Sequence, residues 1–332
     1  MRAAQSFGVD DIRFVADAPD PEPFETDAIV KTEMASLCGS DLHMVGKGWQ
    51  MPEYPAPPGH PGHEGVGIVE EPPQRYPDGE GIDILAPGDL VLTVPHIWYA
   101  KCFAEYQAVD AAHMLKMPAG APVEHVLMTQ QLGTVIFATQ RLPESLEGLT
   151  CAVLGQGSAG LFWDFVLKRR GASRVISIEP VDSRRSLSAR YGADETVDVT
   201  GDAAKDAVYD LTDGKGADVV IEAVGSTPTL SNAFHLVKDE GLCVLFGLPD
   251  SNDPQPFDYT EMFKKRANAY SILGAQEEPG LKTFRRALSW IVEGEIDMAP
   301  IVTHLMPIEQ VTEAFELSES RGDGVVKVAL TF

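Results

Sequence analysis

The side chains best suited to chemistry gather in two short stretches near the beginning of the chain. The first is CGSDLH, which starts at Cys38, and the second is GHEG, which contains His63 and Glu64. A thiolate, an imidazole and a carboxylate are ligand types that zinc takes in catalytic sites. Neighbouring glycines let backbone and metal approach closely. Together the stretches predict a metal site, although each residue alone is equally typical of a buried cysteine or a turn histidine.

A glycine-rich turn further along the chain predicts a dinucleotide site. Gly155, Gly157 and Gly160 form a GxGxxG pattern between an apolar segment, 151–154, and a helical one, 159–170. The first glycine permits a tight turn, the second lets the backbone approach a pyrophosphate, and the third lets helix and strand pack closely. The N-terminus of the helix offers N–H donors to phosphates. The residues expected to bind cofactor here are Gly155, Gly157, Ser158, Ala159 and Gly160.

An acidic residue after the next strand-like segment predicts which dinucleotide binds. Glu179 follows the apolar segment 174–178 and comes about twenty residues after the glycine-rich turn. A carboxylate there accepts hydrogen bonds from a ribose 2′-hydroxyl and repels a 2′-phosphate, so we expect NAD. Arg184 follows closely in the sequence and is able to neutralise a 2′-phosphate, which keeps NADP open.

The arrangement of periodic segments predicts two domains, as the length of 332 residues does. Short β-type runs between Pro- and Gly-rich turns in the first part indicate an irregular β domain; they are 28–32, 65–69, 89–94 and 104–109. After residue 149, strands alternate with helices, which indicates a parallel sheet covered by helices. The further segments of this kind are strands 217–221 and 242–246 and helices 183–191 and 281–292. Near residue 297 the proline-punctuated β character returns and runs to the last residue. We therefore expect an α/β protein with one domain at 1–134 and 297–332 and a doubly wound domain at 135–296.

Composition argues against several classes of function. The chain has 26 Lys and Arg against 50 Asp and Glu, a formal net charge of −24. Nucleic acid and anionic membranes are poor partners for such a polyanion, because both are bound through positive charge. No run of 18 apolar residues and no signal-peptide core is present, and the four cysteines are scattered without a CxxC pair. We expect a reduced, cytoplasmic protein.

The motifs together resemble the zinc-containing medium-chain dehydrogenase/reductase superfamily, which includes alcohol, polyol, threonine and glucose dehydrogenases. The resemblance runs nearly end to end, through CGSDLH at Cys38, GHEGVG at Gly62, PGD at 87–89, AEY at 104–106, GQGSAG at Gly155 and the final KVALTF. It implies a GroES-like catalytic domain and an inserted Rossmann domain. It also implies a homodimer or homotetramer that transfers hydride between a small-molecule alcohol or carbonyl substrate and NAD.

The resemblance also implies a zinc site and a route for the proton. Cys38 and His63 are the expected ligands, Glu64 is a direct or exchanging ligand, and Gln130 occupies the remaining ligand position. The resemblance further implies that Asp41 orients His63, that Ser40 receives the substrate hydroxyl proton, and that His43 passes this proton to solvent. For the cofactor, it implies that Thr134 contacts the nicotinamide, Lys327 the pyrophosphate and Arg184 the adenosine.

Two departures from the family pattern bear on the metal. The four-cysteine lobe that holds a structural zinc is absent between Val94 and Ala104, so one catalytic zinc and no structural zinc is expected. Gln130 offers a neutral amide where Cys or Glu is usual, and an amide oxygen is a weaker ligand. The leading interpretation is a zinc- and NAD-dependent dehydrogenase of a polar alcohol such as a polyol or sugar. A zinc-independent reductase and a non-catalytic nucleotide-binding scaffold remain alternatives.

Overall fold

The computed structural model describes residues 1–322 and 324–332 and divides into two compact units. Unit 1 comprises Met1–Phe137 and Gly274–Phe332, and unit 2 comprises Ala138–Leu273. This division differs from the expected boundary because residues 274–296 pack with unit 1. In particular, Phe284 lies so close to Gly133 that a Cβ on Gly133 would be 2.4 Å from Phe284 Cδ1. The helix that carries Phe284 therefore belongs with the first unit by packing.

Unit 1 is built on a seven-stranded sheet with a small hairpin beside it. Its strand order is β14-β15-β3-β4-β5-β7, and β6 pairs with β3. The strands of unit 1 are β1 (Ala3–Gly8), β2 (Asp11–Val15), β3 (Asp27–Ser36), β4 (Gly65–Glu71), β5 (Leu90–Thr93), β6 (Tyr106–Asp110), β7 (Met114–Lys116), β14 (Val302–Pro307) and β15 (Lys327–Thr331). Its helices are α1 (Gly39–Lys47), α2 (Val123–Leu127), α3 (Thr129–Ala138), α9 (Lys282–Val292) and α10 (Val311–Ser320).

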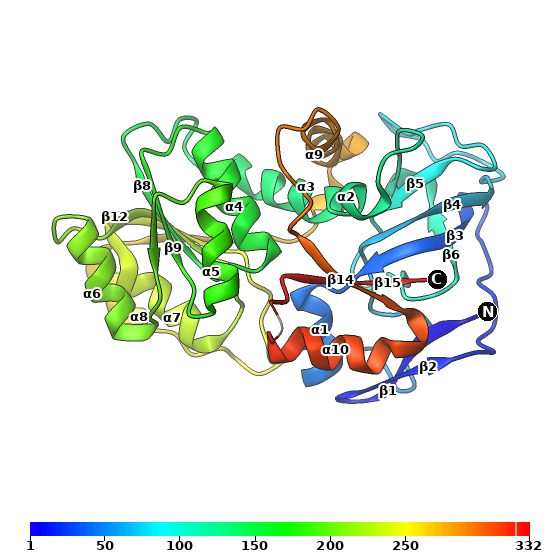
Figure 1. The fold of residues 1–332 in the computed structure, drawn as a ribbon, viewed down its shortest axis with the longest axis horizontal. Helices are drawn as coiled ribbons and strands as arrows, with labels where there is room; N and C mark the ends of the chain where they lie inside the picture. Colours follow the sequence, from blue (N-terminus) through cyan, green and yellow to red (C-terminus); the bar gives the residue numbers. More distant parts are fainter. Residues whose placement is uncertain (323) are drawn as a thin grey trace. The chain divides into compact units, whose positions relative to one another are not determined.

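The last strand of the chain lies inside this sheet rather than at its edge. β15 pairs parallel with β14 and antiparallel with β3, with Ala329 opposite Ser36. The sequence places these strands at opposite ends of the chain, and Figure 1 shows the red C-terminal strand close to the blue strand β3. The C-terminal strands thus return to the first domain, as expected from the sequence.

Unit 2 is a six-stranded parallel sheet in the order β10-β9-β8-β11-β12-β13. This is the Rossmann order 3-2-1-4-5-6. Helices α4 and α5 cover one face, and α6, α7 and α8 cover the other (Figure 1). The strands are β8 (Thr150–Leu154), β9 (Arg174–Ile178), β10 (Glu195–Val197), β11 (Ala217–Glu222), β12 (Val237–Leu245) and β13 (Asn268–Ser271). The helices are α4 (Ser158–Arg169), α5 (Asp182–Ser188), α6 (Gly201–Leu211), α7 (Thr227–Leu236) and α8 (Tyr259–Lys265). The expected fold class is confirmed.

Helix α10 departs from the expectation of β structure to the end of the chain. Its buried residues Val311, Ala314, Phe315 and Ser318 recur at i, i+3, i+4 and i+7, the spacing of one helix face. That face packs on β2 and β15. The helical spacing outweighs the prolines that precede it, because Pro307 stops β14 before the helix begins. Among the described residues, no helix is both long and apolar enough to cross a bilayer.

Candidate active site

Strand register brings the two chemistry-bearing stretches together. β3 and β4 are antiparallel, with Ala35 opposite Gly65, so the end of β3 meets the start of β4. The pairing continues one residue further, where the Ser36 N–H donates to the Glu64 carbonyl at 3.0 Å. Cys38 then caps the start of α1 immediately after β3. Residues distant in sequence are therefore held at one end of a strand pair.

One ligand atom from each of Cys38, His63 and Glu64 lies within 4.8 Å of the others. Three protein ligands of sulfur, nitrogen and oxygen type match a catalytic zinc site, which keeps its fourth position for water or substrate. Glu64 Oε1 is buried and receives no hydrogen bond from the described residues, as expected for a carboxylate oxygen kept for a cation. These residues fit a zinc ion.

The other cysteines differ from Cys38 in their surroundings. Cys38 is half-buried, whereas Cys102, Cys151 and Cys243 are fully buried. Burial raises the pKa of each of these three thiols to about 12. A thiol must lose its proton to bind a metal. Cys38 is therefore the cysteine suited to metal binding among the four.

Asp41 contacts both the cysteine and the histidine of this cluster. Its Oδ2 accepts a hydrogen bond from the Cys38 N–H at 2.8 Å, closing a capping box at the start of α1. Its Oδ1 lies 3.1 Å from His63 Nδ1. Burial by itself lowers the pKa of His63, but the Asp41 carboxylate outweighs it and holds that pKa well above its usual value. A metal-bound imidazole is neutral, so a single proton kept on Nδ1 would leave the lone pair of Nε2 to a metal.

A buried ion pair lies behind Glu64. Lys327 Nζ is 2.6 Å from Glu64 Oε2, and both side chains are at most 2% exposed. The Ser36 hydroxyl donates to the same oxygen. Burial alone would raise the pKa of Glu64, but Lys327 and His63 lower it below its ordinary value. The sequence assigned Lys327 to a cofactor pyrophosphate, whereas the structure places its ammonium against Glu64.

Ser40 and His43 lie on the same face of α1, three residues apart. Ser40 is buried, and its Oγ lies 3.2 Å from His63 Nε2. His43 is half-buried. A hydroxyl beside the metal-facing nitrogen, followed by an imidazole nearer to solvent, has the order that a proton relay needs.

Helix α3 presents two glutamines, of which the second contacts the cluster. Gln131 Nε2 lies 3.9 Å from Cys38 Sγ. The sequence assigned the ligand position to Gln130, which is buried, and whose backbone carbonyl accepts a hydrogen bond from Thr134 Oγ1 at 3.0 Å. Sequence reasoning missed Gln131 and Ser36. The place of Ser36 depends on the register between β3 and β4, which no motif in the sequence signals.

The glycine-rich turn of unit 2 has the local geometry of a phosphate-binding turn. Gly155 follows β8 with φ of 89°, which favours glycine. A Cβ on Gly160 would lie 1.9 Å from the Gly155 carbonyl oxygen, so only glycine fits there. A Cβ on Gly157 would meet nothing within 4 Å. The turn therefore leaves open space at Gly157, and Ser158 and Ala159 begin helix α4 beside it.

Glu179 is buried at the end of β9 and braces this turn. Its Oε2 accepts a hydrogen bond from the Gln156 N–H at 2.8 Å, and its Oε1 accepts one from the Val181 N–H at 2.9 Å. Arg185 donates to the Glu179 carbonyl at 2.9 Å. A carboxylate has room for more than two hydrogen bonds, so Glu179 retains acceptor capacity.

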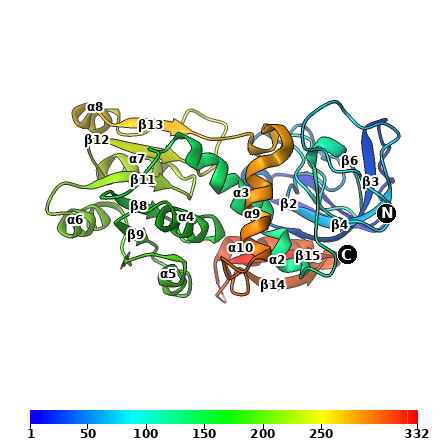
Figure 2. The same ribbon diagram turned by 90° about the horizontal axis from the view of Figure 1, so that it is seen from above.

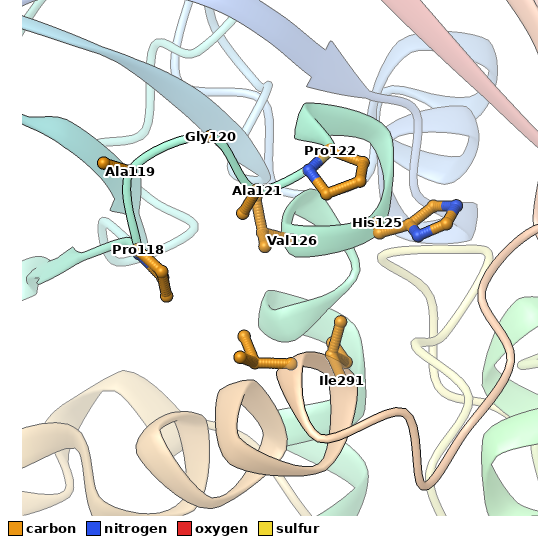
Figure 3. A pocket seen from close by; sticks show the side chains of 9 residues that line it. Pro118, Ala119, Gly120, Ala121, Pro122, His125, Val126 and Ile291 are labelled. Atoms are coloured by element: carbon orange, nitrogen blue, oxygen red, sulfur yellow. The ribbon is translucent and has the colours of Figure 1, made fainter.

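A surface pocket of about 300 Å³ lies in unit 1, and its lining includes no residue of the clusters described above. Figure 3 shows the loop at Pro118–Pro122, with His125 of α2 and Ile291 of α9, around it. Its walls are mostly apolar, and His125 is the one titratable side chain among them. A pocket without converging polar groups lacks what catalysis requires.

Comparisons with known proteins agree with this geometry. Residues 25–132 match the family described as alcohol dehydrogenase GroES-like domain, and residues 160–293 match zinc-binding dehydrogenase. The L-threonine 3-dehydrogenase of Pyrococcus abyssi is 29% identical over 98% of this chain and 96% of its own. That of Bacillus subtilis is 28% identical over 94% and 93%.

Solved structures share the fold over the whole chain. Alcohol dehydrogenase TADH from Thermus sp. ATN1 is 24% identical, covers 100% of both chains and has a TM-score of 0.81. Galactitol-1-phosphate dehydrogenase from Escherichia coli is 20% identical, covers 100% of both chains and has a TM-score of 0.80. With a GroES-like unit, a Rossmann unit and a Cys-His-Glu cluster, this chain belongs to the zinc-binding medium-chain dehydrogenases.

Proposed function

We propose that the protein is a zinc- and NAD-dependent dehydrogenase of a small polar alcohol, of the polyol or sugar kind. The observation that carries the proposal is the clustering of Cys38, His63 and Glu64. Relatives are named for substrates with polar hydroxyl groups, such as L-threonine and galactitol 1-phosphate. These names support the substrate class, and NADP remains the alternative cofactor.

Cys38, His63 and Glu64 are the residues that hold zinc in this proposal, with a glutamine of α3 beside them. Zinc supplies Lewis acidity, which lowers the pKa of an alcohol as it lowers that of a water molecule. Asp41 keeps the proton of His63 on Nδ1. The distance of 3.9 Å between Gln131 Nε2 and Cys38 Sγ favours Gln131 over Gln130 as the amide nearest the metal site.

The reaction moves a proton and a hydride in different directions. Ser40 Oγ receives the hydroxyl proton of the alcohol and passes one to His43, which releases it to solvent. A bound nicotinamide would accept the carbon–hydrogen electron pair as hydride, which would leave a carbonyl product. We assign Thr134 to contact with the nicotinamide, because it lies half-buried on the helix that carries Gln131.

The glycine-rich turn and Glu179 are the proposed cofactor site. The turn residues 155–160 take the pyrophosphate at the start of α4, and the remaining acceptor capacity of Glu179 takes the ribose hydroxyls. We keep Arg184 as the proposed adenosine contact.

The function is tested by metal analysis and a substrate screen on the same preparation. Zinc is measured per chain, and a panel of alcohols, polyols and sugars is tested with NAD and with NADP by the absorbance of the reduced nicotinamide. We expect about one zinc per chain and turnover that a chelator abolishes and added zinc restores. Turnover without metal would support a zinc-independent reductase, and NADH binding without turnover of any alcohol would support a scaffold.

We also propose a homodimer or homotetramer formed through strand β13. β13 is an edge of its sheet, as Figure 2 shows, and among the described residues it pairs only with β12. Unpaired strand edges bind other chains readily. Light scattering tests the proposal, and a monomer at working concentrations would contradict it.

A further inference from the structure

We propose that Lys327 is a positioning residue for the metal site: it holds one oxygen of Glu64 and offsets its charge, so that Glu64 binds zinc weakly and leaves the ion electrophilic. This inference rests on the proposed zinc function. It replaces the pyrophosphate contact that the sequence assigned to Lys327.

The sheet itself fixes Lys327 in this place. Lys327 begins β15, which is held between β14 and β3. The Leu37 N–H donates to the Val328 carbonyl at 2.9 Å, and Ala329 lies opposite Ser36. The backbone next to Lys327 is thus bonded to the same strand end that leads into Cys38. Its ammonium cannot leave Glu64 without losing burial and its partner.

The contacts divide the Glu64 carboxylate into two oxygens with different surroundings. Oε2 lies 2.6 Å from Lys327 Nζ and accepts the Ser36 hydroxyl. Oε1 is buried and receives no hydrogen bond from the described residues. A carboxylate tied by one oxygen has only the other to give to a metal, and it cannot bind in a bidentate manner. The anchored oxygen therefore limits Glu64 to a single, exchangeable bond.

Formal charges lead to the same conclusion. A Cys38 thiolate and a Glu64 carboxylate would together cancel both charges of Zn²⁺. The Asp41 carboxylate beside His63 adds a third negative charge, and the Lys327 ammonium balances it. Charges in a buried site act strongly on one another because little water screens them. An ion in a charge-balanced cluster polarises a substrate oxygen more strongly than an ion in a cluster with net negative charge.

The test compares Lys327→Met with the wild type. Methionine keeps an unbranched chain and removes the charge. Zinc affinity is measured by competition with a chelator, and the coordination of Co²⁺ in place of zinc is read from its visible absorption, which weakens as a four-coordinate site gains a fifth ligand. NADH binding to the metal-free protein is the third measurement. Lys116→Met is the matched control, because Lys116 is a lysine of unit 1 paired with Asp89 at 2.7 Å but 45% exposed.

We expect Lys327→Met to hold zinc about 10-fold more tightly, because a positive charge that repels the ion is removed. We also expect it to weaken the Co²⁺ absorption and to oxidise alcohol more slowly, with unchanged NADH affinity. Tighter metal with slower turnover is a combination that simple loss of structure does not produce. Lys116→Met should match the wild type in all three measurements, and Lys327→Arg should keep the wild-type Co²⁺ spectrum.

Loosened zinc in Lys327→Met, or an unchanged Co²⁺ spectrum with weakened NADH binding, would overturn the inference; the second result would restore the pyrophosphate assignment. If Lys327→Met does not fold, Lys327→Gln carries the test. Glutamine removes the charge beside Glu64 Oε2 but keeps a hydrogen-bond donor. This variant should also hold zinc more tightly and weaken the Co²⁺ absorption, and no change in either would overturn the inference. A wild-type protein without a thiolate–Co²⁺ band would instead overturn the zinc function itself.

Discussion

One carboxylate, that of Asp41, positions both the thiol and the imidazole of the metal cluster. Its Oδ2 accepts the Cys38 N–H at 2.8 Å, and its Oδ1 lies 3.1 Å from His63 Nδ1. Asp41 therefore contributes both to the helix cap of α1 and to the orientation of His63, whose Nδ1 also lies 3.3 Å from the Pro61 carbonyl oxygen. A cap made by a residue without a second acceptor would leave the Pro61 carbonyl as the remaining partner of His63 Nδ1.

Asp41→Asn separates these two roles. The amide oxygen of asparagine still accepts the Cys38 N–H, so helix α1 should remain capped. The amide no longer offers His63 a charged acceptor, and we expect zinc affinity to fall by about 10–100-fold. Chelator competition measures the affinity, and thermal unfolding of the metal-free protein measures the cap. Asp110→Asn is the control, because Asp110 accepts the Ala112 N–H at 2.8 Å in a turn without a metal ligand. Equal zinc affinity in both variants would contradict the proposed orientation of His63.

Cys38→Ser should remove zinc and activity together. A serine hydroxyl is a poor substitute for a thiolate, so we expect less than one zinc per chain and a fall in turnover of about 100-fold or more. Elemental analysis and steady-state kinetics are the measurements. Cys102→Ala tests a cysteine that is neutral because burial raises its pKa to about 12. That variant should keep its zinc, and full turnover by Cys38→Ser would rule out the metal mechanism.

Glu179→Gln should weaken NAD binding more than NADP binding. The change leaves an oxygen for the Gln156 N–H but removes the charge that favours ribose hydroxyls and repels a 2′-phosphate. A hydrogen bond to a charged group contributes about 1.5–3 kcal/mol, which corresponds to roughly a 10–100-fold change in Kd for NAD. Titration with each reduced cofactor measures it. Glu195→Gln, an exposed change on β10, should leave both affinities unaltered. A parallel loss for NAD and NADP would mean that Glu179 only braces the turn.

Asp164 of α4 is expected to make stability fall as pH rises. Its carboxyl is fully buried, and burial raises its pKa well above the usual value despite a hydrogen bond from Ser177 at 2.6 Å. The folded chain therefore keeps a proton that the unfolded chain releases above about pH 3.9. Stability from this group is lost as pH rises from about 4 through the folded pKa.

Asp164→Asn should accordingly unfold at a higher temperature than the wild type at pH 7. This difference in unfolding temperature should vanish below about pH 4, where the wild-type carboxyl is protonated in both states. Thermal unfolding followed across pH is the measurement. Asp182→Asn, which removes a charge at the exposed start of α5, controls for the change in net charge. A destabilised Asp164→Asn at every pH would show that the carboxyl is ionised in the folded protein.

Local patterns made the Rossmann unit predictable from the sequence. The strand at 174–178 coincides with β9, and the turn at Gly155 leads into α4 one residue before the expected start. These elements are specified by residues adjacent in the chain. The same holds for Cys38, His63 and Glu64, whose short motifs predicted the cluster that the structure brings together.

Relationships set by register and helix rotation were beyond the sequence. The pairing of Lys327 with Glu64 depends on β15 lying beside β3, and the approach of Gln131 to Cys38 depends on how α3 is turned about its axis. Neither contact can be read from the residues that flank Lys327 or Gln131 in the chain. The assignments of Lys327 to a phosphate and of Gln130 to the metal followed from motif position, which carries no information about these contacts.

The place of β15 between β14 and β3 has a consequence for biosynthesis. Unit 2 is one contiguous segment, and it emerges from the ribosome before the last strand of unit 1 exists. Domains generally fold as units during translation. The nascent chain therefore carries Cys38, His63 and Glu64 for most of its synthesis without the strand that supplies Lys327. Loading of the proposed zinc ion in its final environment would wait until β15 has been made, which would make metal uptake a late step in maturation.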